Sequence, residues 1–183
     1  MTVVETIRSR RSIRKYKTDP VSDEKLSLVI ESAMWAPSWA NTQCCKLVVA
    51  KDSNTKIKIS EALTPGNPAT EAVRTAPVVI VACAELGKAG FKKGEVATDK
   101  GDWFMFDVAL VMQNLVLAAW ELGLGTVHVG LMDAKKIEGI LNVPDGVRVV
   151  GLTPLGYPDE DPKGPGRKDK QETVFYERYG QAV

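Results

Sequence analysis

No excess of charge of one sign marks this sequence, because its 24 lysines and arginines are balanced by 23 aspartates and glutamates. A net charge of +1 gives no global field that would attract nucleic acid or an anionic membrane. Long hydrophobic runs are also missing, since the longest apolar stretch, Val108 to Trp120, is interrupted by Gln113 and Asn114. We therefore expect neither a nucleic-acid partner nor a membrane-spanning segment.

Cysteine and histidine are scarce. The three cysteines, Cys44, Cys45 and Cys83, and the single histidine, His128, offer no C-x-x-C spacing and no even set of thiols. This argues against a zinc site and a disulfide framework. Free thiols and an amino terminus without an apolar signal core lead us to expect a cytoplasmic protein. A Cys–His nucleophile stays open, although a histidine between two valines is more typical of a packed residue than of a base.

Familiar catalytic signatures are absent as well. The sequence contains no Gly-x-Ser-x-Gly elbow, no Walker loop and no Gly-x-Gly-x-x-Gly fingerprint. No pair of carboxylates stands out among the scattered acids. Without a recognisable acid, base, metal site or nucleophile, the chemistry would have to come from a cofactor.

Hydrophobic periodicity predicts one domain over residues 1–183, built as a mixed layer of helices and three or four strands. Pro37 ends the second helix and opens a loop over 35–43. The continuous apolar run 77–84 predicts a strand buried on both faces, and the Gly- and Lys-rich segment 86–98 is expected to be a mobile cap. Helices are expected at 3–11, 22–35, 53–63, 69–75, 102–122 and 133–141, and strands at 46–50, 77–84, 126–129 and 147–155.

The tail after Glu172 carries an apolar element that must be buried somewhere: Val174, Phe175, Tyr176 and Tyr179. One possibility is an arm that packs on a neighbouring subunit or extends its sheet. The other is a tail folded on its own subunit. The sequence leaves both open.

Two short basic clusters lie near opposite ends of the chain, Arg10-Arg11-Ser12-Ile13-Arg14 and Gly164-Pro165-Gly166-Arg167-Lys168. Their chemistry suits a dianionic phosphate, because a guanidinium binds it bidentately, a serine adds a hydrogen bond and a lysine adds a point charge. If both clusters meet in space, the chain closes around one phosphorylated small molecule. The alternative is two solvated basic patches.

Four segments in order carry a family resemblance: 10–14, 36–43, 107–125 with its Gln113-Asn114 pair, and Gly156-Tyr157-Pro158 followed by Arg167-Lys168. Over nearly its whole length the chain resembles the nitroreductase-like flavoproteins. The resemblance implies an α+β fold with a central, mostly antiparallel sheet flanked by helices. It also implies an intertwined homodimer that binds flavin mononucleotide (FMN) at the subunit interface.

The resemblance implies roles residue by residue. Arg14 would lie near the pyrimidine edge of the flavin, where a cation stabilises the charge that the ring gains on reduction. The phosphate would be held by Arg10, Arg11 and Ser12 and, from the other end of the chain, by Arg167 and Lys168. The ring would be lined by Pro37, Ser38, Trp39 and Asn41 of the other subunit and by Val129 and Gly130.

Two departures from the family pattern affect the expected pocket. Cys44-Cys45 stand where the family often has proline and a large aromatic residue, so the pocket floor is smaller or these are ordinary buried thiols. A mid-chain contact to the ribityl or phosphate does not align, and Asn67 and Arg74 are only candidates for it.

The implied activity is hydride transfer from NAD(P)H to FMN and on to a small conjugated acceptor of nitroaromatic or quinone type, in ping-pong order. Rival interpretations keep FMN with another reaction, such as dehalogenation or dehydrogenation, or make the chain a non-catalytic flavin-binding module. A phosphate-ligand binder without flavin is a further alternative.

Overall fold

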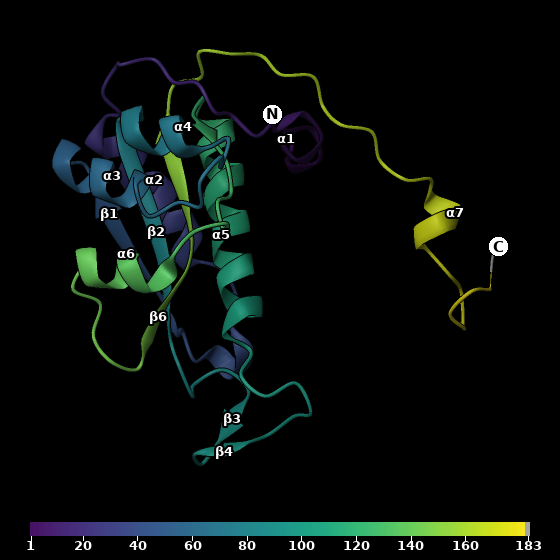
Figure 1. The fold of residues 1–183 in the computed structure, drawn as a ribbon. Coiled ribbons are helices and arrows are strands. Elements are labelled where there is room, and N and C mark those ends of the chain that lie inside the picture. Colours follow the sequence, from purple (N-terminus) through teal and green to yellow (C-terminus); the bar gives the residue numbers. More distant parts are fainter. Residues whose placement is uncertain (182–183) are drawn as a thin grey trace.

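A four-stranded antiparallel sheet forms the centre of the molecule, with strand order β1-β2-β6-β5 (Figure 1). Its strands are β1 (Cys45–Ala50), β2 (Val78–Glu85), β5 (Gly125–Thr126) and β6 (Val147–Gly156). The long strand β2 pairs with β1 on one side and β6 on the other. The computed structural model describes residues 1–181, and its mixed α+β architecture confirms the predicted fold class.

Most predicted elements are present, with ends shifted by a few residues. The first helix stops at Ser9 rather than at residue 11, so Arg10 and Arg11 lie in extended chain. The helices are α1 (Val3–Ser9), α2 (Asp23–Met34), α3 (Ser53–Ser60), α4 (Thr70–Thr75), α5 (Phe104–Glu121), α6 (Ala134–Ile140) and α7 (Lys170–Thr173), with a 3-10 turn η1 (Trp39–Asn41).

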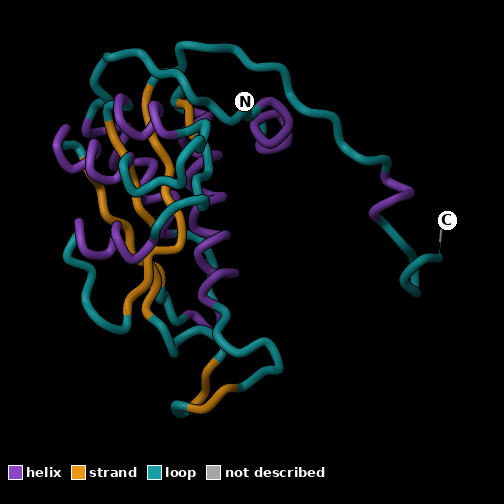
Figure 2. Tube along the Cα trace, viewed as in Figure 1, coloured by secondary structure: helices purple, strands orange, loops and turns teal. Residues whose placement is uncertain are grey.

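Helices cover both faces of the sheet, as Figure 2 shows. One core lies between the sheet and helices α2 and α5, and the other lies between the sheet and helices α3, α4 and α6. Alternate residues of β2 enter the two cores: Val78 and Ile80 enter the first, and Val79 and Val81 enter the second. This two-sided burial confirms the prediction for residues 77–84 and explains why the run is continuously apolar.

Helix α5 is the longest of the described helices. Its 18 residues are long and apolar enough to cross a membrane by length and composition, which corrects the expectation that no apolar run reaches that length. Here the helix packs beside the sheet and buries Val108, Leu115 and Val116, as the central helix of a globular core does.

Two segments project from the body (Figure 1). Within the segment expected to be a mobile cap, β3 (Phe91–Lys92) and β4 (Glu95–Val96) form a hairpin that the sequence did not predict. The tail extends away from its own body, and Tyr179 is 95% exposed. The tail is therefore not folded on its own subunit, which leaves the arm as the remaining prediction.

Candidate functional site

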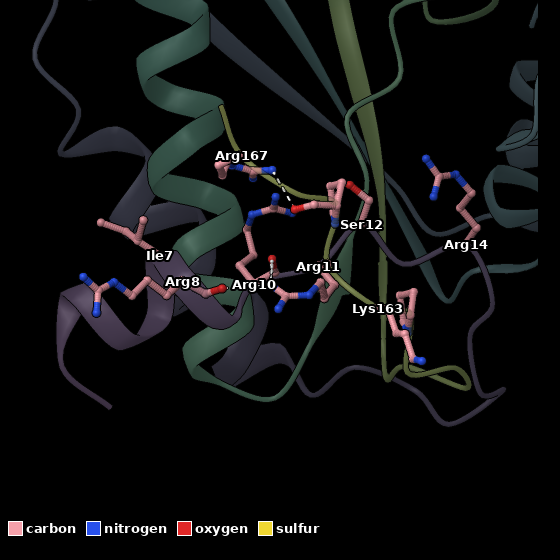
Figure 3. Close-up of a pocket in the computed structure, with 11 residues that line it drawn as sticks. Ile7, Arg8, Arg10, Arg11, Ser12, Arg14, Lys163 and Arg167 are labelled. Carbon is pink, nitrogen blue, oxygen red and sulfur yellow. Dashed lines mark hydrogen bonds between the residues drawn. The ribbon is translucent and has the colours of Figure 1, made fainter. Parts of the chain in front are cut away.

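The two basic clusters meet in one cavity of about 530 Å³ between α1 and the chain that follows β6 (Figure 3). Six cationic side chains and no carboxylate line it. Within residues 1–181, no ion pair joins any of these six side chains to an acid. The lining residues are Ile7, Arg8, Arg10, Arg11, Ser12, Arg14, Pro162, Lys163, Gly164, Pro165 and Arg167.

Backbone pairing holds the two ends of the chain together around this cavity. The amide of Lys17 donates to the carbonyl of Tyr157 over 2.9 Å, and that of Asp159 donates to the carbonyl of Lys15 over 2.9 Å. The Glu160 carboxylate accepts hydrogen bonds from the amides of Arg14 and Lys15. The convergence of the basic clusters is thus a consequence of a short ladder between residues 15–17 and 157–160.

Two glycines permit the close approaches that shape the cavity. A Cβ on Gly125 would lie 2.8 Å from the Cβ of Ile13, beside the bridge between Ser12 and Thr126. A Cβ on Gly164 would lie 2.8 Å from the guanidinium of Arg11. A side chain at Gly125 would push Ile13 and the N-terminal basic segment aside, whereas one at Gly164 would require only the flexible end of Arg11 to move.

Two arginines of the cavity donate to backbone carbonyls of their own segments, and for Arg167 these are the carbonyls of Pro165 and Gly166 over 3.3 Å. Arg11 donates to the carbonyls of Arg8 and Arg10 over 2.8 and 2.9 Å, so its guanidinium also supports the loop. Burial, and then the neighbouring charges of Arg11 and Arg167, lower the pKa of Arg10. Like charges gathered around a partly buried guanidinium disfavour its charged form, and an anion bound among them would relieve that repulsion.

Arg14 and Lys168 do not join the cluster formed by Arg10, Arg11 and Arg167. Arg14 lines the cavity, but Figure 3 shows it on the other side of Ser12 from Arg10 and Arg167. Lys168 is exposed on the tail and is not among the residues that line the cavity. The arrangement supports Arg14 acting at a different part of a ligand from Arg10.

The loop predicted to line the flavin ring has a strained backbone. Ala40, Asn41 and Gln43 adopt left-handed φ angles of 45°, 57° and 50°, and each such residue costs about 1–3 kcal/mol. The hydroxyl of Ser38 accepts from the amide of Gln43 over 2.9 Å, which closes the turn. Backbone strain of this kind clusters at binding and active sites.

This loop and the basic cavity lie at opposite ends of α5. The amide of Trp39 bonds Asp107 in the first turn of the helix, whereas Thr6 of α1 bonds Glu121 in its last turn over 2.7 Å. Glu121 follows Asp107 by 14 positions, which corresponds to about 21 Å along the helix at 1.5 Å per residue. One chain therefore does not bring the predicted phosphate and ring residues together.

Val129 and Gly130 form the segment predicted to pass near the ring, and contacts within the single chain account for Val129 but not for a glycine at position 130. Val129 is buried and exchanges 2.9 Å backbone bonds with Leu152. Gly130 is exposed, and a Cβ there would meet nothing within 4 Å, so no contact in this chain requires a glycine.

The candidate mid-chain contacts separate in the structure. Asn67 donates to the carbonyl of Leu131 over 2.8 Å, which places it beside Gly130. Arg74 lies 3.6 Å from Glu71 in the same helix. Of the two candidates, only Asn67 is tied to the segment predicted to approach the ring.

The thiols do not suit nucleophilic chemistry. Burial raises the pKa of Cys44 to about 11 and that of Cys45 to about 12, and it raises the pKa of Cys83 to about 11. Burial, and secondarily Arg10, lower the pKa of His128. Protonated thiols argue against the Cys–His alternative, and residues 1–181 contain no cluster of three metal-ligating side chains.

Sequence reasoning missed two cationic lining residues and one acidic residue. Arg8 and Lys163 flank the predicted clusters and could have been found from local charge density alone. Asp107 holds the loop by contacts across 68 residues of sequence. The available signal for it was an acid near the start of a mostly apolar helix.

Comparison with known proteins gives consistent results. Residues 7–157 match the model of the Nitroreductase family. An FMN reductase of Bacillus subtilis is 30% identical over 175 residues, which cover 89% of this chain and 69% of the relative. An NADH dehydrogenase of Thermus thermophilus is 30% identical over 177 residues, which cover 83% of this chain and 84% of the relative.

Solved structures agree in fold. A nitroreductase family protein from Clostridium novyi NT has a TM-score of 0.78 at 34% identity, covering 100% of this chain and 97% of that one. An FMN-dependent nitroreductase from Clostridium difficile R20291 has a TM-score of 0.81 at 26% identity, covering 96% of this chain and 99% of that one.

Proposed function

The chain belongs to the Nitroreductase family, and from that premise we propose that it is an FMN-dependent oxidoreductase that takes hydride from NAD(P)H and reduces a small conjugated acceptor. The observation that carries the proposal is the acid-free cavity formed by both ends of the chain. Relatives described as an FMN reductase and an FMN-dependent nitroreductase support the cofactor.

The residues of the cavity fit the phosphate of FMN. Arg10 and Arg167 offer guanidinium groups without carboxylate partners among the described residues, and Ser12 adds a hydroxyl to the same lining. A phosphate dianion would supply the charge that this cluster lacks and would accept several hydrogen bonds at once. Arg11 would add charge while continuing to support the loop.

We assign the complete site to a homodimer. The loop 37–41 and the basic cavity lie about 21 Å apart along α5, so a second copy running in the opposite direction is needed to place one beside the other. The exposed tail suits an arm on that partner, because Val174, Tyr176 and Tyr179 find no cover on their own body. Dimer formation would bury these side chains.

A bound FMN would supply two-electron hydride exchange between NAD(P)H and the acceptor. The chain contributes binding and electrostatics. Arg10, Ser12 and Arg167 would hold the phosphate, and Arg14 would place a cation near the ring, where it would stabilise negative charge. Pro37, Ser38, Trp39 and Asn41 of the second copy exclude water from the ring.

The acceptor is proposed by class only. Nitroaromatic and quinone compounds are flat and conjugated, and they suit a face walled by an indole such as Trp39. Cytoplasmic localisation stays a prediction from the free thiols.

A spectrum and a turnover assay test this function. The purified protein is expected to show the absorbance bands of oxidised flavin. Under anaerobic conditions it should consume more than one equivalent of NADH or NADPH per flavin only when a nitroaromatic or quinone acceptor is present. Arg10→Ala and Arg167→Ala should lose FMN on purification, whereas Lys58→Ala, in a helix on the other face of the sheet from α5, should not. Colourless protein that fails to take up added FMN would refute the cofactor. Flavin binding without NAD(P)H oxidation would instead indicate a non-catalytic flavin module.

A further inference from the structure

Asp107 is a charged core residue that the proposed reaction does not use. It is 0% exposed in the first turn of α5. Within the part of the chain that the structure describes, no lysine, arginine or histidine forms an ion pair with it. A buried carboxylate is costly unless its oxygens are hydrogen-bonded, so the donors around it show what it is there to hold.

Those donors belong to the two ends of one loop. The Trp39 amide donates to both carboxylate oxygens of Asp107 over 2.9 and 3.1 Å. The Cys44 thiol donates to Oδ2 over 3.5 Å. The N-terminal end of α5 adds a favourable dipole for the negative charge. Asp107 thus clamps residues 39 and 44 to the helix, and the segment between them is held at both ends.

The clamped segment needs an external restraint. Ala40, Asn41 and Gln43 all have left-handed backbone angles, although none is glycine. The Thr42 hydroxyl is buried without a hydrogen-bond partner. Such conformations persist only where the surrounding structure over-determines them. The Cys44 end is also held by the sheet, because the amide of Glu85 donates to the carbonyl of Cys44 over 2.9 Å. At the other end, the hydrogen bonds from the Trp39 amide to Asp107 connect the loop to helix α5.

We propose that Asp107 is a positioning residue that holds the 38–43 loop in the shape in which it lines the flavin ring. The clamp is a property of the single chain, whereas its effect on the flavin rests on the proposed function. Asp107 acts through Trp39 and Cys44 and does not itself contact the ring.

The first test measures the loop without any flavin. Asp107→Ala removes both acceptors, and Asp107→Asn keeps one oxygen for the Trp39 amide. Val108→Ala is the matched control, because Val108 is the next residue of α5, is 2% exposed and packs in the core. In flavin-free protein, amide hydrogen exchange in a peptide covering residues 38–44 should accelerate at least tenfold in Asp107→Ala and less in Asp107→Asn. Val108→Ala should leave that peptide at the wild-type rate.

The second test uses riboflavin, which has the ring but no phosphate. Asp107→Ala should weaken the binding of riboflavin and of FMN by the same factor, at least tenfold, because only the ring contact is lost. Arg10→Ala should weaken the binding of FMN alone. The ratio of the affinity for FMN to that for riboflavin should therefore stay at the wild-type value in Asp107→Ala and fall in Arg10→Ala. A general loss of stability would not produce this difference between the two variants.

The outcomes separate the two proposals. Loop exchange and riboflavin affinity in both Asp107 variants equal to those of Val108→Ala would overturn the clamp while leaving the flavin function intact. Wild-type protein that binds neither flavin would overturn the proposed function, and the exchange rates would still decide the clamp. If Asp107→Ala does not fold, the comparison of Asp107→Asn with Val108→Ala decides between a clamp and an ordinary core residue.

Discussion

A flavin site shared between two subunits predicts a specific pattern of complementation in mixed dimers. One parent carries Arg10→Ala, which damages the cavity, and the other carries Asp107→Ala, which releases the loop. Loss of a charge-assisted hydrogen bond costs about 1.5–3 kcal/mol, equivalent to about a 10- to 150-fold weaker affinity for FMN. At an FMN concentration of about three times the wild-type Kd, which fills about three quarters of the wild-type sites, each parental homodimer should therefore fill at most about a quarter of its sites.

The mixed dimer should regain one FMN per two chains. One of its two sites combines the intact cavity of the loop variant with the intact loop of the cavity variant, and the other site combines both defects. The reciprocal control places both substitutions in one chain and pairs it with wild type, which damages both shared sites once and should bind almost none. The assay is flavin stoichiometry by absorbance on dimers purified through two different tags. The reverse pattern, with no FMN in the first dimer and one in the control, would show that each site lies within a single chain.

Three further outcomes follow from local contacts. Gly125→Ala should lower the free energy of unfolding by about 1–3 kcal/mol, because its Cβ would lie 2.8 Å from Ile13. Gly139→Ala, where nothing lies within 4 Å of the added Cβ, should instead stabilise its helix by about 0.5–1 kcal/mol. Denaturant titrations of the two variants and the wild type measure both effects. NMR titration of His128 should give a pKa below 6.5 that rises in Arg10→Ala but stays depressed, because burial is the larger cause; an unchanged value would refute the proximity of the two side chains. None of the three thiols should react with a disulfide reagent at about pH 8 before the protein unfolds, since burial raises all their pKa values and the thiolate is the reactive form.

Features governed by local sequence were predictable. The N-caps at Ser22 and Asp133 were visible from residue type, and both side chains accept the expected backbone amides. The apolar run 77–84 was predictable because a strand covered on both faces can tolerate few polar side chains.

Features governed by distant pairing were not. The ladder between residues 15–17 and 157–160 uses backbone groups, which carry no sequence signal. The hairpin β3–β4 has two-residue strands, too short for a period-2 pattern. The clamp at Asp107 depends on a fold that brings the second helix's exit loop to the start of α5.

Because the basic cavity is lined by residues 8–14 and 163–167 together, it cannot form until both segments have been synthesised. At about 5–20 residues per second, the roughly 150 intervening residues take the ribosome about 8–30 s. During that interval the N-terminal arginines are unpaired positive charges on a growing chain. If this cavity holds FMN as proposed, cofactor capture is a late event in biogenesis. A nonsense codon anywhere before residue 167 would then yield a product that lacks part of the cavity lining even when the sheet has formed.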